Sequence, residues 1–183
     1  RARHSRTGSC ARACKSGQSM NSHTGSIEVV PLAGAELRPM APADLDAVLC
    51  VEREIYPFPW TEGNFLDSLS AGYDCQVVTR SGALLGYAVT MLTPDEVHLL
   101  NLSVAARFQS QGIGRWLLGQ LQARASSKGC SSMLLEVRVS NEGAQKLYRS
   151  MGFTPIGLRR RYYPSFNQSR EDAIVMRRYF NAG

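Results

Sequence analysis

Residues 104–115 carry the clearest chemical signal in the chain. Within them, Gln109, Gly112 and Gly114 follow the apolar run 97–104 and precede a helical pattern. Glycines at a strand-to-helix junction let backbone N–H groups approach an anion closely, and the helix N-terminus adds partial positive charge. A pyrophosphate fits such a turn, but loops before helices are also glycine-rich for packing alone. The motif by itself leaves both interpretations open.

A carboxylate interrupts the apolar segment 133–139. Glu136 is either a strand-end residue that faces solvent or a partly desolvated general base at the mouth of a cleft, because burying an unpaired charge costs on the order of several kcal/mol. Tyr148 falls on the inward stripe of the next helical pattern, where it is either a core tyrosine or a phenol that points at the same cleft. Asn141 begins that helix and is suited to cap it.

Two aromatic segments stiffened by proline, 56–60 and 159–164, together suit the walls of a peptide groove. Taken singly, each is typical of an ordinary packed loop, and its arginines are typical of a solvated surface. The candidate substrate contacts are Tyr56, Phe58, Trp60, Arg161, Tyr162 and Tyr163. His98 lies in an apolar strand pattern and is expected to be structural.

The elements that must position these residues follow from periodicity and chain breakers. Apolar spacing predicts helices over 42–55, 61–69, 112–128 and 141–151. Alternating or apolar runs predict strands over 27–30, 36–38, 73–79, 83–93, 96–104, 132–139, 154–161 and 172–178, with a hairpin at Ser81-Gly82. The crossover helix 112–128 predicts that the strands on either side of it are parallel neighbours. The fold class is mixed α/β, with one parallel pair among antiparallel strands.

Composition limits the classes of function. The chain has 183 residues, 44% hydrophobic and 20% charged, which suits one globular domain. Its formal charge of +6 is concentrated in residues 1–19, which hold no acid, whereas from Met20 onward 16 basic residues face 15 acidic ones. We therefore expect residues 1–26 to be a disordered basic tail or upstream expression sequence, and 27–183 to be one domain. A basic arm that touches RNA is the alternative for the tail.

Cysteine usage and hydropathy predict the surroundings. The five cysteines and three histidines are scattered, without the spacing of a zinc site or a disulfide framework. No run approaches the ~18 apolar residues that span a membrane. We expect a cytoplasmic protein without metal, membrane or nucleic-acid partner, and a monomer or weak dimer.

Three motifs together resemble the GNAT family of acetyl-coenzyme A-dependent N-acetyltransferases. They are Gln109-x-x-Gly112-x-Gly114, Leu135-Glu-Val-Arg-Val-Ser-Asn141 and Ala144-x-x-Leu-Tyr-x-x-Met-Gly-Phe153. Flanking segments resemble the RimI branch in particular: Phe58-Pro-Trp-Thr-Glu62, Arg160-Arg-Tyr-Tyr-Pro164 and Glu171-Asp-Ala-Ile174. The resemblance covers about residues 36–178. Ala105-Ala106 replaces the Asp-Pro that is common in the family. This change alters a turn and affects no residue with an expected chemical role.

The resemblance implies a fold and a set of residue roles. The family fold is a mostly antiparallel sheet of about seven strands with four helices, in which a splayed parallel pair holds the coenzyme. Glu136 matches the general base and Tyr148 the general acid. The matching coenzyme contacts are Leu102, Ser103, Val104, Gln109, Ser110, Gln111, Gly112, Ile113, Gly114, Arg115 and Asn141.

The same resemblance implies an activity, since the RimI branch acetylates the N-terminal alanine of a small-subunit ribosomal protein. A neutral amine must attack the thioester, and an α-amine (pKa ~7.7–8.0) is neutral far more often than a lysine (~10.4) near pH 7. Direct transfer to a protein N-terminus from acetyl-coenzyme A is therefore the predicted reaction. The alternatives are a family member with broader N-terminal, lysine or small-amine specificity, and a non-catalytic coenzyme A-binding module.

Overall fold

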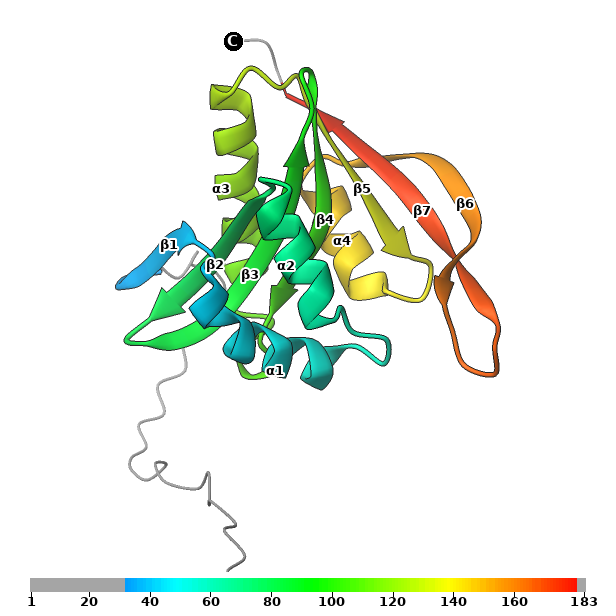
Figure 1. The fold of residues 1–183 in the computed structure, drawn as a ribbon. Coiled ribbons are helices and arrows are strands. Elements are labelled where there is room, and N and C mark those ends of the chain that lie inside the picture. The colour runs from blue at the N-terminus through cyan, green and yellow to red at the C-terminus, as the bar shows by residue number, and fades with distance from the viewer. Residues whose placement is uncertain (1–31, 181–183) are drawn as a thin grey trace, which may run out of the picture.

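The computed structural model describes residues 32–180, so the predicted tail 1–26 and the predicted strand 27–30 lie outside the described residues. Within them, seven strands form one sheet in the order β1-β2-β3-β4-β5-β7-β6 (Figure 1). They are β1 (Ala35–Pro39), β2 (Asp74–Arg80), β3 (Ala83–Leu92), β4 (Glu96–Val104), β5 (Ser132–Arg138), β6 (Thr154–Pro164) and β7 (Arg170–Tyr179). The β4–β5 pair is parallel and the other five pairs are antiparallel, which confirms the predicted fold class.

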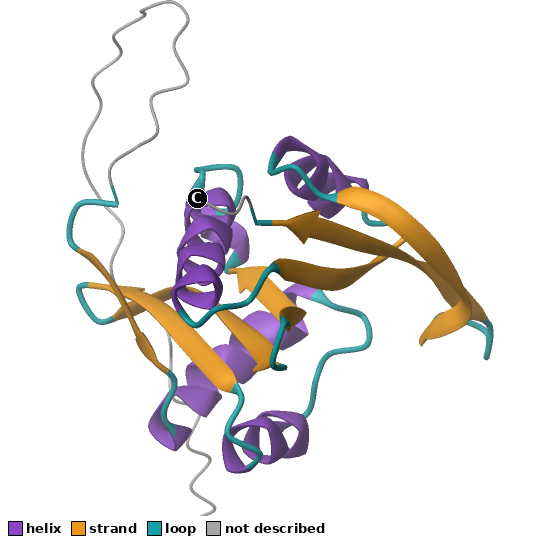
Figure 2. Ribbon diagram, turned by 90° about the horizontal axis from the view of Figure 1, so that it is seen from above, coloured by secondary structure: helices purple, strands orange, loops and turns teal. Residues whose placement is uncertain are grey.

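Four α-helices accompany the sheet, as predicted. They are α1 (Leu45–Ile55), α2 (Glu62–Ser70), α3 (Ile113–Ser127) and α4 (Glu142–Ser150). The predicted first helix differs at its start, because Pro42–Asp44 forms a 3₁₀ turn before α1 begins. Figure 2 shows helices on both sides of the strands. None of the helices between residues 32 and 180 is long and apolar enough to cross a membrane.

Strand alternation divides the apolar side chains between two cores, one on each face of the sheet. On β3, Tyr87 and Val89 pack with α1 and α2, whereas Ala88 between them packs with α3 and α4. A shift of register against β2 leaves Leu85 as an extra residue, which packs on the same face as Ala88. Successive side chains of a strand point to opposite faces, so a strand buried on both faces reads as a continuous apolar run. Because both faces of the central strands are buried, these strands are held firmly in place.

The parallel pair diverges along its length. Direct pairing of β4 and β5 ends at Leu99 and Leu135. Figure 1 shows that these two strands diverge. The register of β4 against β3 also shifts between Leu99 and Asn101, which leaves Leu100 as a bulge. Within the described chain, the part of β4 after Leu99 is paired with β3 alone. Its backbone groups on the β5 side are therefore free to bind a ligand.

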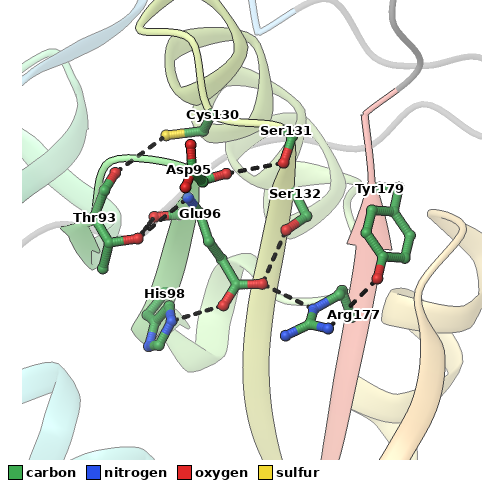
Figure 3. A network of polar contacts seen from close by, with 9 residues as sticks. All are labelled: Thr93, Asp95, Glu96, His98, Cys130, Ser131, Ser132, Arg177 and Tyr179. Atoms are coloured by element: carbon green, nitrogen blue, oxygen red, sulfur yellow. Dashed lines mark hydrogen bonds and ion pairs between the residues drawn. The ribbon is translucent and has the colours of Figure 1, made fainter.

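A polar network connects β4, β5 and β7 at the end where β4 and β5 are still paired (Figure 3). The Glu96 carboxylate on β4 accepts hydrogen bonds from Ser132 Oγ on β5 at 2.9 Å and from Arg177 Nε on β7 at 2.8 Å. His98, predicted to be structural, lies in this network with its Nε2 2.9 Å from Glu96 Oε1. One carboxylate thus ties together three strands at the end opposite the opening.

The last hairpin is longer than the sequence predicts, because β6 continues past Arg161 to Pro164. Arg161 has φ +52°, and its backbone N–H donates to Asp172 Oδ1 at 2.7 Å. The register shifts between Arg159 and Tyr163 at this point. The bulge breaks the two-residue alternation on which strand prediction depends, so the segment resembles a polar loop in the sequence.

Candidate active site

A cleft of about 980 Å³ opens where β4 and β5 diverge. The α1–α2 loop, the end of β4, the start of α3 and the β6–β7 loop line it. Nine of the predicted coenzyme contacts are among its lining residues: Leu102, Ser103, Val104, Gln109, Ser110, Gly112, Gly114, Arg115 and Asn141. The remaining two do not line it: Ile113 is buried in the core, and Gln111 donates its side-chain amide to the Arg107 carbonyl.

The turn from β4 into α3 has the geometry of an anion site. Ser110 and Gly112 both have positive φ, +59° and +82°, and α3 begins directly afterwards at Ile113. Gln109 Nε2 donates to the Val104 carbonyl at 3.0 Å and so fastens the turn to the end of β4. The first N–H groups of a helix lack partners within the helix and carry partial positive charge. This turn can therefore hold a pyrophosphate at the mouth of the cleft.

A smaller cavity of about 360 Å³ adjoins the cleft and shares Tyr56, Phe58, Leu102 and Asn141 with it. The structure brings the two catalytic candidates together here, because Glu136 and Tyr148 both line this cavity. Trp60 and Tyr163, predicted as substrate contacts, line it as well. Arg161 and Tyr162 line neither cavity.

Glu136 lies between the two environments predicted for it. Its side chain is 22% exposed, and its carboxylate forms an ion pair with Arg159 on β6. Arg159 also lies over the Tyr162 ring, 4.0 Å from its centroid. The backbone carbonyl of Glu136 accepts a hydrogen bond from Tyr163 Oη at 3.1 Å. The carboxylate thus reaches the cavity while a flexible cation shields it from solvent.

Tyr148 is almost completely buried on the inward face of α4. Burial raises the pKa of its phenol well above the usual value, and the neighbouring hydroxyls of Tyr56 and Tyr163 raise it further. Within residues 32–180, no hydrogen-bond partner for its hydroxyl is present. The phenol therefore stays protonated at neutral pH, with its hydrogen available to a molecule in the cavity.

The predicted groove wall 56–60 meets the β6–β7 loop, just beyond the other predicted wall, 159–164. The Phe58 ring lies 5.5 Å, centroid to centroid, from the ring of Phe166, which follows β6. Arg138 supports this side, since it donates to the Pro164 carbonyl at 3.0 Å and pairs with Glu171 Oε2 at 3.2 Å. The loops thus form a roof over the space between the diverging strands.

Among the residues that sequence reasoning missed is a buried carboxylate close to the site. Glu52 on α1 is 1% exposed and, through Asn101, is linked to Ser103 and Tyr56 in the cleft. The available sign was its spacing: Glu52 recurs at helical period with Leu45, Val48 and Leu49, which places a carboxylate on the inward stripe. Within the described residues, no group of three or more His, Cys, Asp or Glu is arranged to hold a metal ion.

Comparison with known proteins agrees with this geometry. Residues 45–153 match the model of the acetyltransferase (GNAT) family. The chain is 38% identical over 133 residues to the ribosomal protein bS18-alanine N-acetyltransferase of Escherichia coli (strain K12), which covers 73% of this chain and 89% of that protein. It is 37% identical over 136 residues to the Haemophilus ducreyi enzyme of the same name, with coverages of 74% and 94%.

Solved structures give the same result. The crystal structure of the ribosomal-protein-S18-alanine N-acetyltransferase from Escherichia coli superposes with a TM-score of 0.75 at 34% identity, covering 81% of this chain and 96% of that one. Chaetomium thermophilum Naa20, solved with a bisubstrate analogue, superposes with a TM-score of 0.70 at 25% identity, with coverages of 79% and 86%. The chain belongs to the acetyltransferase (GNAT) family as a RimI-like, acetyl-coenzyme A-dependent N-acetyltransferase.

Proposed function

We propose that this protein acetylates the N-terminal alanine of a small-subunit ribosomal protein in the cytoplasm. The relatives from Escherichia coli and Haemophilus ducreyi carry that substrate, ribosomal protein bS18, in their names. The observation that carries the proposal is the shape of the site. A cavity that holds Glu136 and Tyr148 adjoins a cleft that includes the glycine turn, so two molecules can be held next to one another.

The larger cleft suits the coenzyme. Positive φ at Ser110 and Gly112 and the start of α3 form a cradle of backbone N–H groups for the pyrophosphate. A Cβ added at Gly112 meets nothing within 4 Å, so the cradle is open. The unpaired edge of β4 supplies backbone groups for the pantetheine arm and the acetyl carbonyl. Acetyl-coenzyme A supplies the acetyl group as a thioester.

Glu136 and Tyr148 complete the proton transfers. Glu136 takes one proton from the attacking α-amine, directly or through one water, as nitrogen bonds to the acetyl carbon. Backbone N–H groups of β4 stabilise the oxyanion of the tetrahedral intermediate. Tyr148 gives its proton to the sulfur as the carbon–sulfur bond breaks, and the proton held on Glu136 restores the phenol through solvent. The net products are an acetylated N-terminus and the free thiol.

The test is acetylation of a peptide panel, read by intact mass. The panel contains an alanine-starting ribosomal N-terminus, other N-termini and a peptide whose only amine is an internal lysine, each with acetyl-coenzyme A. We expect acetylation of the alanine-starting peptide above all others. Equal acetylation of many N-termini would replace the single substrate with a broad one. Acetylation of lysine alone, or coenzyme binding without transfer, would overturn the proposal.

A further inference from the structure

A buried carboxylate lies beneath the cleft, on the sheet face that α1 covers. The Glu52 carboxylate accepts hydrogen bonds from Tyr87 Oη, from Asn101 Nδ2 at 2.7 Å and from the backbone N–H of Trp60 at 2.8 Å. Among residues 32–180, no lysine, arginine or histidine forms an ion pair with it. Burying a charge that only neutral donors hold is costly, so stability is a poor explanation for this residue.

A directed chain of hydrogen bonds leads from this carboxylate to the cleft. The carboxylate can only accept, so Asn101 presents its amide N–H₂ to Glu52 and its Oδ1 to Ser103. Ser103 Oγ donates its one hydrogen to Asn101 Oδ1 at 3.1 Å. The Ser103 oxygen must then accept from Tyr56 Oη, 2.9 Å away. The Tyr56 hydrogen is committed to Ser103, which leaves the lone pairs of the phenol oxygen as the only free capacity of that group.

The Tyr56 oxygen is placed where a substrate nitrogen can reach it. Tyr56 directly follows α1, and its side chain lines both the cleft and the smaller cavity. Its hydroxyl is close enough to that of Tyr148 to help raise the pKa of that phenol. A free acceptor therefore faces the region where the two cavities adjoin.

We propose that Glu52 is a positioning residue: through this chain it keeps the Tyr56 oxygen as a hydrogen-bond acceptor for the α-amino group of the substrate. The inference rests on the proposed function, because it takes an α-amine to be the acetyl acceptor.

The test is a double-mutant cycle in the full chain, with steady-state kinetics on the alanine-starting peptide. Tyr56→Phe removes the acceptor and should raise the peptide KM by up to about tenfold, the loss expected for one hydrogen bond between neutral groups, without changing the KM for acetyl-coenzyme A. Glu52→Gln should raise the same KM. The double variant should be no worse than Tyr56→Phe, because Glu52 acts only through that hydroxyl.

A second pair of variants keeps the test valid if Glu52→Gln does not fold. Ser103 and Ser132 are each 3% exposed and each donates to a side-chain oxygen, but only Ser103 belongs to the chain. Ser103→Ala should raise the peptide KM about as much as Tyr56→Phe. Ser132→Ala, the matched control, should leave both KM values unchanged.

The outcomes separate this inference from the proposed function. If the wild-type protein binds coenzyme A but neither binds nor acetylates any N-terminal peptide, the proposed function fails and the inference fails with it. If the wild type acetylates the peptide while Tyr56→Phe and Ser103→Ala leave its KM unchanged, the inference alone is overturned. Additive losses in the double variant would also overturn it, since they would give Glu52 a merely structural role.

Discussion

The carboxylate of Glu136 on β5 is ion-paired with the guanidinium of Arg159 on β6, at the edge of the smaller cavity. A base held in this way must exchange its partner for a water or an amine before it can accept a proton. The side chain of Arg159 is more than half exposed and flexible enough to move aside. Glu136 therefore has two possible roles: it acts as the general base, or it only holds Arg159 in place. Variants of the two partners distinguish these roles.

Glu136→Gln should lower kcat by roughly 10²-fold, because an amide of the same shape cannot take up the proton. The KM for acetyl-coenzyme A should not change, since Glu136 does not line the larger cleft. Arg159→Gln is the matched variant: it breaks the same ion pair but keeps the carboxylate. We expect it to change kcat no more than a few-fold, and an equal loss in both variants would assign Glu136 the anchoring role.

Tyr148→Phe should lower kcat by roughly 10²-fold with little change in melting temperature. The hydroxyl has no partner among the described residues, so its removal breaks no hydrogen bond within residues 32–180. Burial raises the pKa of this phenol above the ordinary value of 10.0, so it remains protonated as the pH rises through 10. The ratio of wild-type to variant kcat should therefore stay constant between pH 7 and 10. A ratio that falls by half near pH 10 would indicate an ordinary phenol.

Local signals in the sequence were enough to predict the sheet and helices, including the parallel pair. The crossover through α3 determined that pair, and the hairpin at Ser81-Gly82 formed as predicted, with φ of +50° and +78°. The bulge at Arg161 could not be predicted in this way, because it depends on a contact with Asp172 on the next strand. Local patterns therefore predict elements better than their irregularities.

The parts of the candidate site that lie in one short segment could be predicted from the sequence. The parts that depend on contacts between distant segments could not. Its glycine turn is a continuous motif, whereas the Glu52 network joins a helix to β3 and β4 across 35 and 49 residues of sequence. Nothing in the sequence near Asn101 or Tyr87 indicates that both face one carboxylate. Such a network depends on how α1 packs against the sheet, and the spacing of residues in the sequence does not show this packing.

Gly112→Ala should weaken coenzyme A binding and destabilise the fold by about 1–2 kcal/mol, because φ of +82° is unfavourable for a residue with a Cβ. The matched variant is Gly119→Ala in the middle of α3. A Cβ meets nothing within 4 Å at either position, so the two differ in backbone conformation and not in space. Gly119→Ala should stabilise the protein by ~0.5–1 kcal/mol and leave coenzyme affinity unchanged. Calorimetric titration and thermal unfolding measure both effects, and equal coenzyme affinity in both variants would remove Gly112 from the cradle.

Stability should fall at acid pH through Glu96. Burial alone would raise the pKa of this carboxyl, but hydrogen bonds from Ser132 and His98, together with the charge of Arg177, outweigh it and hold the pKa below the ordinary 4.5. A carboxyl with a lowered folded-state pKa stabilises the protein above the unfolded-state value and loses that contribution as the pH falls through the folded-state value. Thermal unfolding between pH 7 and 3 should show this decline in the wild type.

The matched variants for this decline are Glu96→Gln and Glu142→Gln. Glu96→Gln should be less stable at pH 7 by about 1–3 kcal/mol, the cost of losing hydrogen bonds to a charged group, and should lose less stability than the wild type as the pH falls. Glu142 is an exposed carboxylate whose ion pair within residues 32–180 is with Lys146, so Glu142→Gln should follow the wild-type curve. Parallel curves for the wild type and Glu96→Gln would show that Glu96 does not control acid stability.

Phe166→Ala should raise the KM for acetyl-coenzyme A several-fold, because Phe166 lines the larger cleft and not the smaller cavity, and it should leave stability almost unchanged. Phe166 is 68% exposed, so removing its ring costs little in folding, but the ring lies against Phe58 and closes the roof of the cleft. Leu158 on the same hairpin is also exposed, at 52%, and lines neither cavity, which makes Leu158→Ala the control. Steady-state kinetics with each substrate varied in turn would show which of the two substrates Phe166 covers. A rise confined to the peptide KM would place Phe166 over the peptide and not over the coenzyme, and no rise in either would mean that the two rings meet without covering a substrate.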